Sequence, residues 1–112
     1  MTKETIEKVK AQNPGVELYR GEISFCDHES KKHDLEFIYR RPSVADMEAY
    51  TKAVPKSSIT AQSNLLAGLI VHPAAAEIIN ELAAYPPVVA DFVNENISPF
   101  FGTAITSRSS RI

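Results

Sequence analysis

The sequence of 112 residues has no tryptophan, a single cysteine and few glycines. The one cysteine, Cys26, excludes an internal disulfide framework and is typical of a protein from a reducing compartment. No uninterrupted apolar stretch approaches the roughly 20 residues that a membrane-spanning helix needs. The first residues also lack the apolar core of a signal peptide. We therefore expect a soluble protein of the cytoplasm.

Cations are missing from a long part of the chain. Ten of the 12 Lys and Arg residues precede Ser57, and the segment from Ser57 to Ser107 contains neither. Its charges are the carboxylates of Glu77, Glu81, Asp91 and Glu95. A net charge of -2 gives no general attraction to nucleic acid or to an anionic membrane. The asymmetry instead predicts an apolar second half that covers a core and offers a surface to another protein.

The first part of the chain changes from a helical to a strand-like pattern. Residues 2–12 are predicted to form a short helix capped by Thr2. Residues 16–27 and 34–40 are predicted to form a β-hairpin, because apolar residues recur there with a period of two. The apolar positions of the first strand change parity around Gly21, which predicts a bulge at that glycine.

The hairpin is predicted to lead into a helix over residues 44–54. Pro42 ends the second strand, and Ser43 is a preferred N-cap residue. Asp46 stands where the acidic partner of a capping box is expected. We expect Val44 to be among the apolar residues that this helix buries.

Three further helices are predicted in the cation-free segment. The first extends from Ser57 or Ser58 to about Val71, and Gly68 within it predicts the close approach of another helix. Pro73 and Pro87 stand where the second and third helices begin, because proline is tolerated at the first helical position. The predicted inner face of the first of these helices consists of Ile59, Leu65, Leu66, Leu69 and Ile70.

These elements predict one α+β domain over residues 1–102. An N-terminal helix and a two-stranded β-hairpin pack on a mainly α-helical bundle of about four helices. Residues 103–112 are rich in Ser, Thr and Arg, and we expect a flexible polar tail there.

The residue types of a metal site occur together around the predicted hairpin turn. Cys26, His28 and His33 supply sulfur and imidazole groups, which zinc accepts. The Cys-x-His spacing matches no standard ligand pair and a fourth ligand is missing, so a solvated turn is the favoured interpretation. A metal-binding module at these three residues stays an alternative.

The remaining polar residues form no catalytic pattern. His72 has no Ser, Cys or Asp near it in the sequence that would suggest a triad. Glu77 and Glu81 are one helical turn apart but have no histidine at helical spacing. Arg40-Arg41 is not accompanied by a glycine-rich phosphate loop. We therefore expect neither catalysis nor a cofactor.

The apolar surplus of the second half predicts a contact surface. A domain of this size buries only about two-thirds of its chain surface, so some apolar side chains are expected to stay exposed for self-association or for a partner helix. The predicted interaction residues are Leu66, Ile70, Val88, Phe92, Phe100 and Phe101.

Several short motifs follow one another in a fixed order between Val16 and Gly102. The second strand ends with the sequence Phe-Ile-Tyr-Arg-Arg-Pro-Ser over residues 37–43. His72-Pro73 and then Tyr85-Pro86 precede apolar helical segments. In this order and at this length the chain resembles the small tail assembly chaperones of long-tailed bacteriophages and prophages.

The resemblance implies a non-enzymatic protein of the host bacterial cytoplasm. Such chaperones self-associate, coat the long helical tape measure protein, help to recruit the major tail protein and are absent from the mature virion. The family often has a longer form, made by frameshifting near the C-terminus. It defines no catalytic residues, and Arg41, Pro42, Tyr85 and Pro86 correspond to structural corners. The alternative is a small prophage-encoded adaptor or regulatory domain that binds one partner in a discrete complex.

Overall fold

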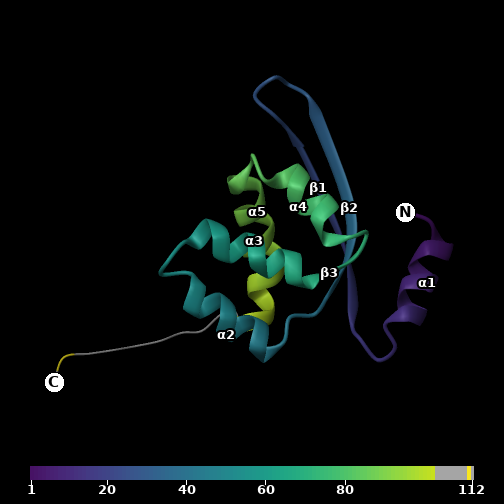
Figure 1. Ribbon diagram of the computed structural model, residues 1–112, viewed down its shortest axis with the longest axis horizontal. Coiled ribbons are helices and arrows are strands. Elements are labelled where there is room, and N and C mark those ends of the chain that lie inside the picture. The colour runs from purple at the N-terminus through teal and green to yellow at the C-terminus, as the bar shows by residue number, and fades with distance from the viewer. Residues whose placement is uncertain (103–110, 112) are drawn as a thin grey trace.

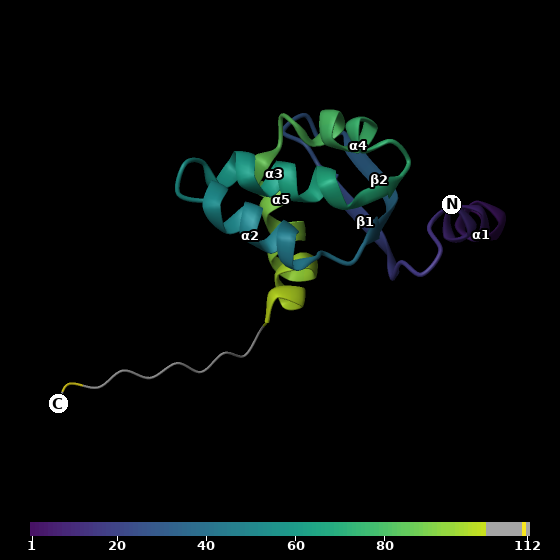
Figure 2. The ribbon, with the colours of Figure 1, turned by 60° about the horizontal axis from the view of Figure 1, so that its bottom comes forward.

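The computed structural model describes residues 1–102 and 111 and has the predicted α+β fold. A three-stranded antiparallel sheet has one helix on one face and a group of helices on the other (Figures 1 and 2). The elements are α1 (Lys3–Gln12), β1 (Leu18–Cys26), β2 (Lys32–Arg40), α2 (Val44–Ala53), α3 (Ser58–Leu69), β3 (Ile70–His72), α4 (Ala75–Leu82) and α5 (Pro86–Phe92). A π-helical stretch, Val93–Ile97, and a 3-10 turn, Ser98–Phe101, continue α5. Apart from Arg111, the predicted tail lies outside the described residues.

The hairpin of β1 and β2 is regular along its whole length. Its register runs without a shift from the pair Leu18–Arg40 to the pair Cys26–Lys32, so the predicted bulge at Gly21 is wrong. An irregularity lies instead between β2 and β3, next to Ile38. The aromatic ring of Phe37, opposite Gly21, occupies the space that a side chain at Gly21 would need.

The parity change that suggested a bulge has another cause, because both faces of the hairpin are covered. Ile23 faces the large core beneath the helices. Leu18 has the opposite parity and lines a hollow together with Ile6 of α1 and Ile38 of β2. α1 therefore lies against the outer face of the sheet, where Val9 and Ile38 are buried apart from the main core (Figure 2).

A third strand replaces the predicted end of the helix before Pro73. α3 ends at Leu69, and Ile70–His72 pairs antiparallel with β2, His72 opposite Ile38. Two β-branched residues favour a strand, and the residue before a proline is disfavoured in the helical region. The sheet therefore has three strands, the two of the predicted hairpin and β3.

The predicted starts of α1, α2 and α3 are confirmed, but two predicted inner residues are not. The Ser43 hydroxyl accepts the N–H of Asp46, and the Asp46 carboxylate accepts the N–H of Ser43, so the capping box is present. Val44 is nevertheless 69% exposed and Ile59 is 55% exposed. Both residues lie in the first turn of their helices, and Ala61 is the first residue of α3 that is buried.

The last helices pack as their apolar pattern predicts. α4 begins at Ala75, two residues after Pro73, and α5 begins at Pro86, one residue before the predicted start. Their inner faces bury Ile78, Leu82, Val89 and Phe92, and the π-helical stretch after α5 buries Val93 and Ile97. Among the described residues, no helix is both long and apolar enough to cross a membrane.

Candidate functional site

The six predicted interaction residues divide into a buried and a half-buried group. Leu66, Ile70 and Phe92 are 0%, 7% and 6% exposed and belong to the core, so they are not part of the exposed surface of this structure. They stand on the inner stripe of their elements, where the sheet and the neighbouring helices cover them. Val88 and the pair Phe100-Phe101 are half-buried.

Phe100 and Phe101 close one end of the fold. The Phe100 ring packs edge-on against Tyr19, with 5.0 Å between the ring centroids. The guanidinium carbon of Arg41 lies 5.6 Å from the centroid of the same ring, which is cation–π geometry. The ring of Phe101 is 6.1 Å from that of Tyr50 in α2. These contacts hold the 3-10 turn to the sheet and to α2.

A groove between α2 and α3 is a surface that the sequence did not predict. It has a volume of about 170 Å³. Its lining consists of Asp46, Ala49, Tyr50, Ala53, Ala61, Asn64, Leu65 and Gly68. A methyl group added at Gly68 would meet no atom within 4 Å outside its own surroundings. The prediction that another helix of this chain approaches Gly68 closely is therefore wrong, and the position is open.

An ion pair between Arg40 and Asp46 lies at one end of this groove. The guanidinium of Arg40 donates two hydrogen bonds to the Asp46 carboxylate, of 2.7 and 3.0 Å, and one of 3.0 Å to the Gly68 carbonyl oxygen. Together with the hydrogen bonds from Ser43, this guanidinium holds the pKa of Asp46 well below its usual range. The arrangement fixes the end of β2, the start of α2 and the end of α3 relative to one another.

The three predicted metal ligands are not brought together. Cys26 pairs with Lys32 and Phe25 with His33, and neighbouring positions of a strand point to opposite faces. Cys26 is exposed, the His28 side chain is 81% exposed, and His33 lies on the inner face. Among residues 1–102 and 111, no group of three or more His, Cys, Asp and Glu side chains could hold a metal ion.

His33 instead joins a polar cluster at the tip of the hairpin. Its Nε2 lies 2.8 Å from Asp27 Oδ2, and its Nδ1 lies 3.5 Å from Glu81 Oε1 of α4. The Tyr85 hydroxyl donates to Asp27 Oδ2 over 3.5 Å. The imidazole stacks on the Phe25 ring, with 4.6 Å between centroids and an interplanar angle of 3°. The cluster ties the hairpin tip to α4 and to the start of α5.

Asp27 is the centre of this cluster. Its Oδ1 accepts the N–H groups of Glu29 and Lys31 over 2.8 and 3.0 Å, which closes the turn. The hydrogen bond with His33, followed by these two, lowers the pKa of Asp27 to about 2. The bond to Asp27, aided by Glu81, raises the pKa of His33. Both imidazole nitrogens face carboxylates, which favours a structural ion pair over a catalytic base.

The cluster predicts a pH dependence of stability. Because the pKa of His33 is raised above its ordinary 6.5, its contribution is complete below pH 6.5 and is lost as the pH rises through the folded-state pKa. Because the pKa of Asp27 is lowered, its contribution is complete above pH 3.8 and is lost as the pH falls towards about 2. The His33→Gln variant is expected to lose the alkaline decline that His33 causes.

Urea unfolding at a series of pH values between 3 and 9 measures this effect as a difference between variant and wild type. His28→Gln is the matched control, because the His28 side chain is exposed, and it is expected to keep the wild-type profile. Equal alkaline slopes for wild type and His33→Gln would contradict the assignment.

The other polar residues considered from the sequence lie apart from one another. His72 pairs with Ile38 in the sheet. Glu81 contacts His33, whereas Glu77 is exposed. Arg41 donates to the Glu17 carboxylate over 3.1 Å and so joins the two ends of the hairpin.

The chain shares its fold with a protein of known structure and belongs to a domain family. The chain is similar to the solved structure of an uncharacterised protein, rbstp2171, from Bacillus stearothermophilus, with a TM-score of 0.65 and 22% identity over 93% of this chain and 99% of that chain. At this identity the likeness shows a shared α+β fold. No curated protein matches the chain. The model of the domain of unknown function DUF6848 matches residues 7–108, and the chain belongs to this family.

Proposed function

We propose that this protein is a non-enzymatic tail assembly chaperone of a long-tailed phage or prophage. It associates with itself, binds the helical tape measure protein and helps to recruit the major tail protein. The proposal is supported by the resemblance in motif order between Val16 and Gly102. It is also supported by the shape and chemistry of the groove between α2 and α3.

The groove is the observation that carries the proposal. Half of the residues that line it are small, namely Ala49, Ala53, Ala61 and Gly68, and the groove is open over Gly68. Every residue of α2 is at least partly exposed, so this helix retains contact surface after folding. An amphipathic helix binds such a groove by placing its apolar side chains between the two helices. A long helical client fits this geometry.

The groove has little charge. Asp46 is the charged residue of its lining, and its carboxylate is already paired with the guanidinium of Arg40. α3 itself contains no charged residue. Binding would therefore depend on apolar contact more than on ion pairs, and would vary little with salt concentration.

A larger side chain at Gly68 tests this proposal, because it fills the groove without disturbing the core. Gly68→Leu is expected to fold, because the added side chain enters open space. It is also expected to lower at least tenfold the affinity for a helical fragment of the tape measure protein from the same genome. Gly68→Ala is the matched control. It is expected to keep that affinity and to raise the free energy of unfolding by about 1 kcal/mol, the difference between Gly and Ala inside a helix.

The measurements are fluorescence anisotropy with the labelled fragment, and size exclusion with light scattering over a range of protein concentrations. Unchanged affinity in Gly68→Leu would remove the groove from the client site. A wild-type protein that stays monomeric and leaves tape measure fragments insoluble would overturn the proposed function. A discrete complex with another partner would favour the adaptor alternative.

A further inference from the structure

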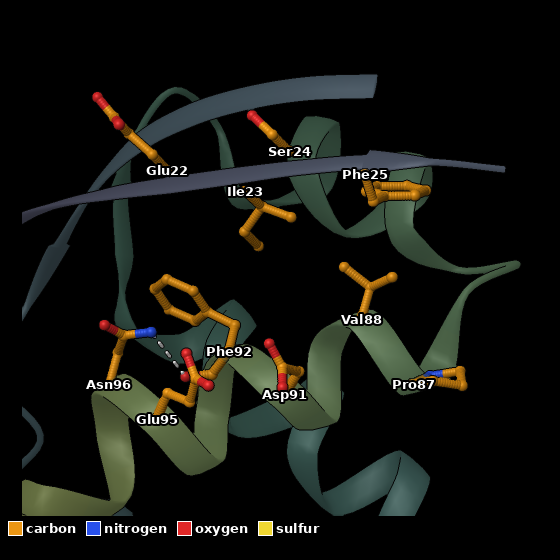
Figure 3. A pocket seen from close by; sticks show the side chains of 10 residues that line it. All are labelled: Glu22, Ile23, Ser24, Phe25, Pro87, Val88, Asp91, Phe92, Glu95 and Asn96. Atoms are coloured by element: carbon orange, nitrogen blue, oxygen red, sulfur yellow. Dashed lines mark hydrogen bonds between the residues drawn. The ribbon is translucent and has the colours of Figure 1, made fainter. Parts of the chain in front are cut away.

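A second groove lies between β1 and α5. It has a volume of about 440 Å³ (Figure 3). Ile23 points from β1 towards the helix, and Val88 and Phe92 point from α5 towards the strand. Ten residues line the groove: Glu22, Ile23, Ser24, Phe25, Pro87, Val88, Asp91, Phe92, Glu95 and Asn96.

One wall of this groove is the free edge of the sheet. The strand order is β1-β2-β3, so within the described part of the chain β1 pairs on one side only. The Asp27 N–H donates to the Lys31 carbonyl and the Arg41 N–H to the Glu17 carbonyl, both over 3.0 Å. Because bonded and non-bonded pairs alternate in an antiparallel ladder, these two bonds assign the odd-numbered residues of β1 to pairing with β2. The backbone groups of the even-numbered residues, among them Glu22 and Ser24, therefore point to the open edge.

The other wall carries negative charge. Asp91 and Glu95 are exposed and lie one helical turn apart, on the side of the helix that faces the groove (Figure 3). Among residues 1–102 and 111, neither carboxylate has an ion-pair partner. The lining contains three carboxylates and one side-chain amide but no Lys or Arg. Its charge is complementary to a cationic ligand.

The spacing of side chains along the helix is also close to the spacing along the strand. Residues four apart on a helix are separated by about 6 Å along its axis. Residues two apart on a strand are separated by about 6.6 to 6.8 Å. A strand added beside β1 would therefore place every second side chain opposite one turn of α5, in step with Asp91 and Glu95.

We propose that this groove binds an extended, basic segment of a partner protein as a fourth strand of the sheet. Main-chain hydrogen bonds to the open edge, around Glu22 and Ser24, supply the affinity common to any strand. Lys or Arg at alternate positions faces Asp91 and Glu95 and selects the sequence. The proposal does not depend on a client in the groove between α2 and α3, because the two surfaces share no residue.

The probe is a fluorescein-labelled peptide of the length of β1, 9 residues, in which Arg alternates with Thr. It is expected to bind saturably, and the double variant Asp91→Lys/Glu95→Lys is expected to weaken binding at least tenfold. The matched control is Glu48→Lys/Glu77→Lys. It changes the net charge equally at two exposed residues outside the groove, and it is expected to alter the affinity less than twofold.

Two further peptides separate strand addition from simple charge attraction. The same peptide with alternate backbone nitrogens methylated keeps its charge but loses its strand-forming donors, and is expected to bind at least tenfold more weakly. A peptide with Glu in place of Arg is expected not to bind. Peptide addition is also expected to slow amide exchange at Glu22 and Ser24.

Three outcomes would overturn the proposal. The first is the absence of saturable binding by the alternating peptide. The second is equal binding by the methylated peptide, which would leave charge attraction alone. The third is protection of the Glu22 and Ser24 amides before any peptide is added, because the edge would then be occupied by the chain's own tail or by a second copy.

Discussion

Leu66→Asp is expected to abolish folding. The Leu66 side chain is 0% exposed and lies in the core between the sheet and the helices. An unpaired carboxylate in such a place costs several kcal/mol, whether it stays charged or takes up a proton. The whole stability of a domain of this size is about 5–15 kcal/mol. Circular dichroism during heating is therefore expected to show no cooperative transition for this variant.

Val44→Asp is the matched control for this substitution. Val44 is 69% exposed, and surface changes of this kind usually alter the free energy of unfolding by less than about 0.5 kcal/mol. This variant is expected to unfold cooperatively near the wild-type temperature. A folded Leu66→Asp protein that fails only in assembly would place Leu66 at an interface and contradict the core described here.

Gly21→Ala is expected to destabilise the protein by about 1–3 kcal/mol, the usual cost of overpacking a core. At an ordinary strand position the same change is favourable, because alanine loses less conformational entropy than glycine on folding. Here the new methyl group would lie 2.5 Å from Cε2 and 2.6 Å from Cζ of Phe37. The Phe37 ring is fully buried and packs edge-on against Phe92, with 5.2 Å between centroids, so it has little room to move.

A double-mutant cycle tests this explanation. Phe37→Leu removes the ring atoms that collide with the methyl group, so Gly21→Ala is expected to cost at least about 1 kcal/mol less in that background. Urea unfolding of the four proteins measures the coupling energy. Additive effects of the two substitutions would show that the glycine is required for a reason other than the Phe37 ring.

The two grooves can be tested separately because they lie on different elements. The groove around Gly68 is apolar and belongs to α2 and α3, whereas the groove below β1 combines a strand edge with the carboxylates of Asp91 and Glu95. The Gly68→Leu variant is expected to leave peptide binding at β1 unchanged. The charge-reversal variant at Asp91 and Glu95 is expected to keep the affinity for a helical client.

Local signals predicted much of the fold correctly. The side chains of Thr2, Ser43 and Ser57 cap their helices as the sequence indicates, because N-capping involves residues only three positions apart. The alternation in β2 identifies Leu35 and Phe37 as inner residues, because one face of that strand is buried in the large core. These predictions needed no knowledge of which elements pack together.

The predictions that failed depended on packing. A helical pattern does not show which side of a helix faces the sheet, so the sequence favours burial of Ile59, which is exposed, and does not show that Leu66 lies in the core. The prediction for Gly68 fails for the same reason. A glycine in a helix is compatible both with the close approach of another helix and with open space, and the structure shows open space. The cluster of Asp27 and His33 with Glu81 joins residues 48 positions apart, and no local pattern reveals such a contact.

The sequence by itself determined the α+β class, the places where α1, α2 and α3 begin, and the cation-free segment from Ser57 to Ser107, from which a protein-binding function is proposed. These properties follow from capping, periodicity and composition, which act over a few residues. The tertiary structure alone decided that Ile70–His72 becomes a strand, that β1 forms the edge of the sheet, and that grooves open beside Gly68 and Asp91. Pairing and burial join distant segments, so these features exist only once the chain has folded.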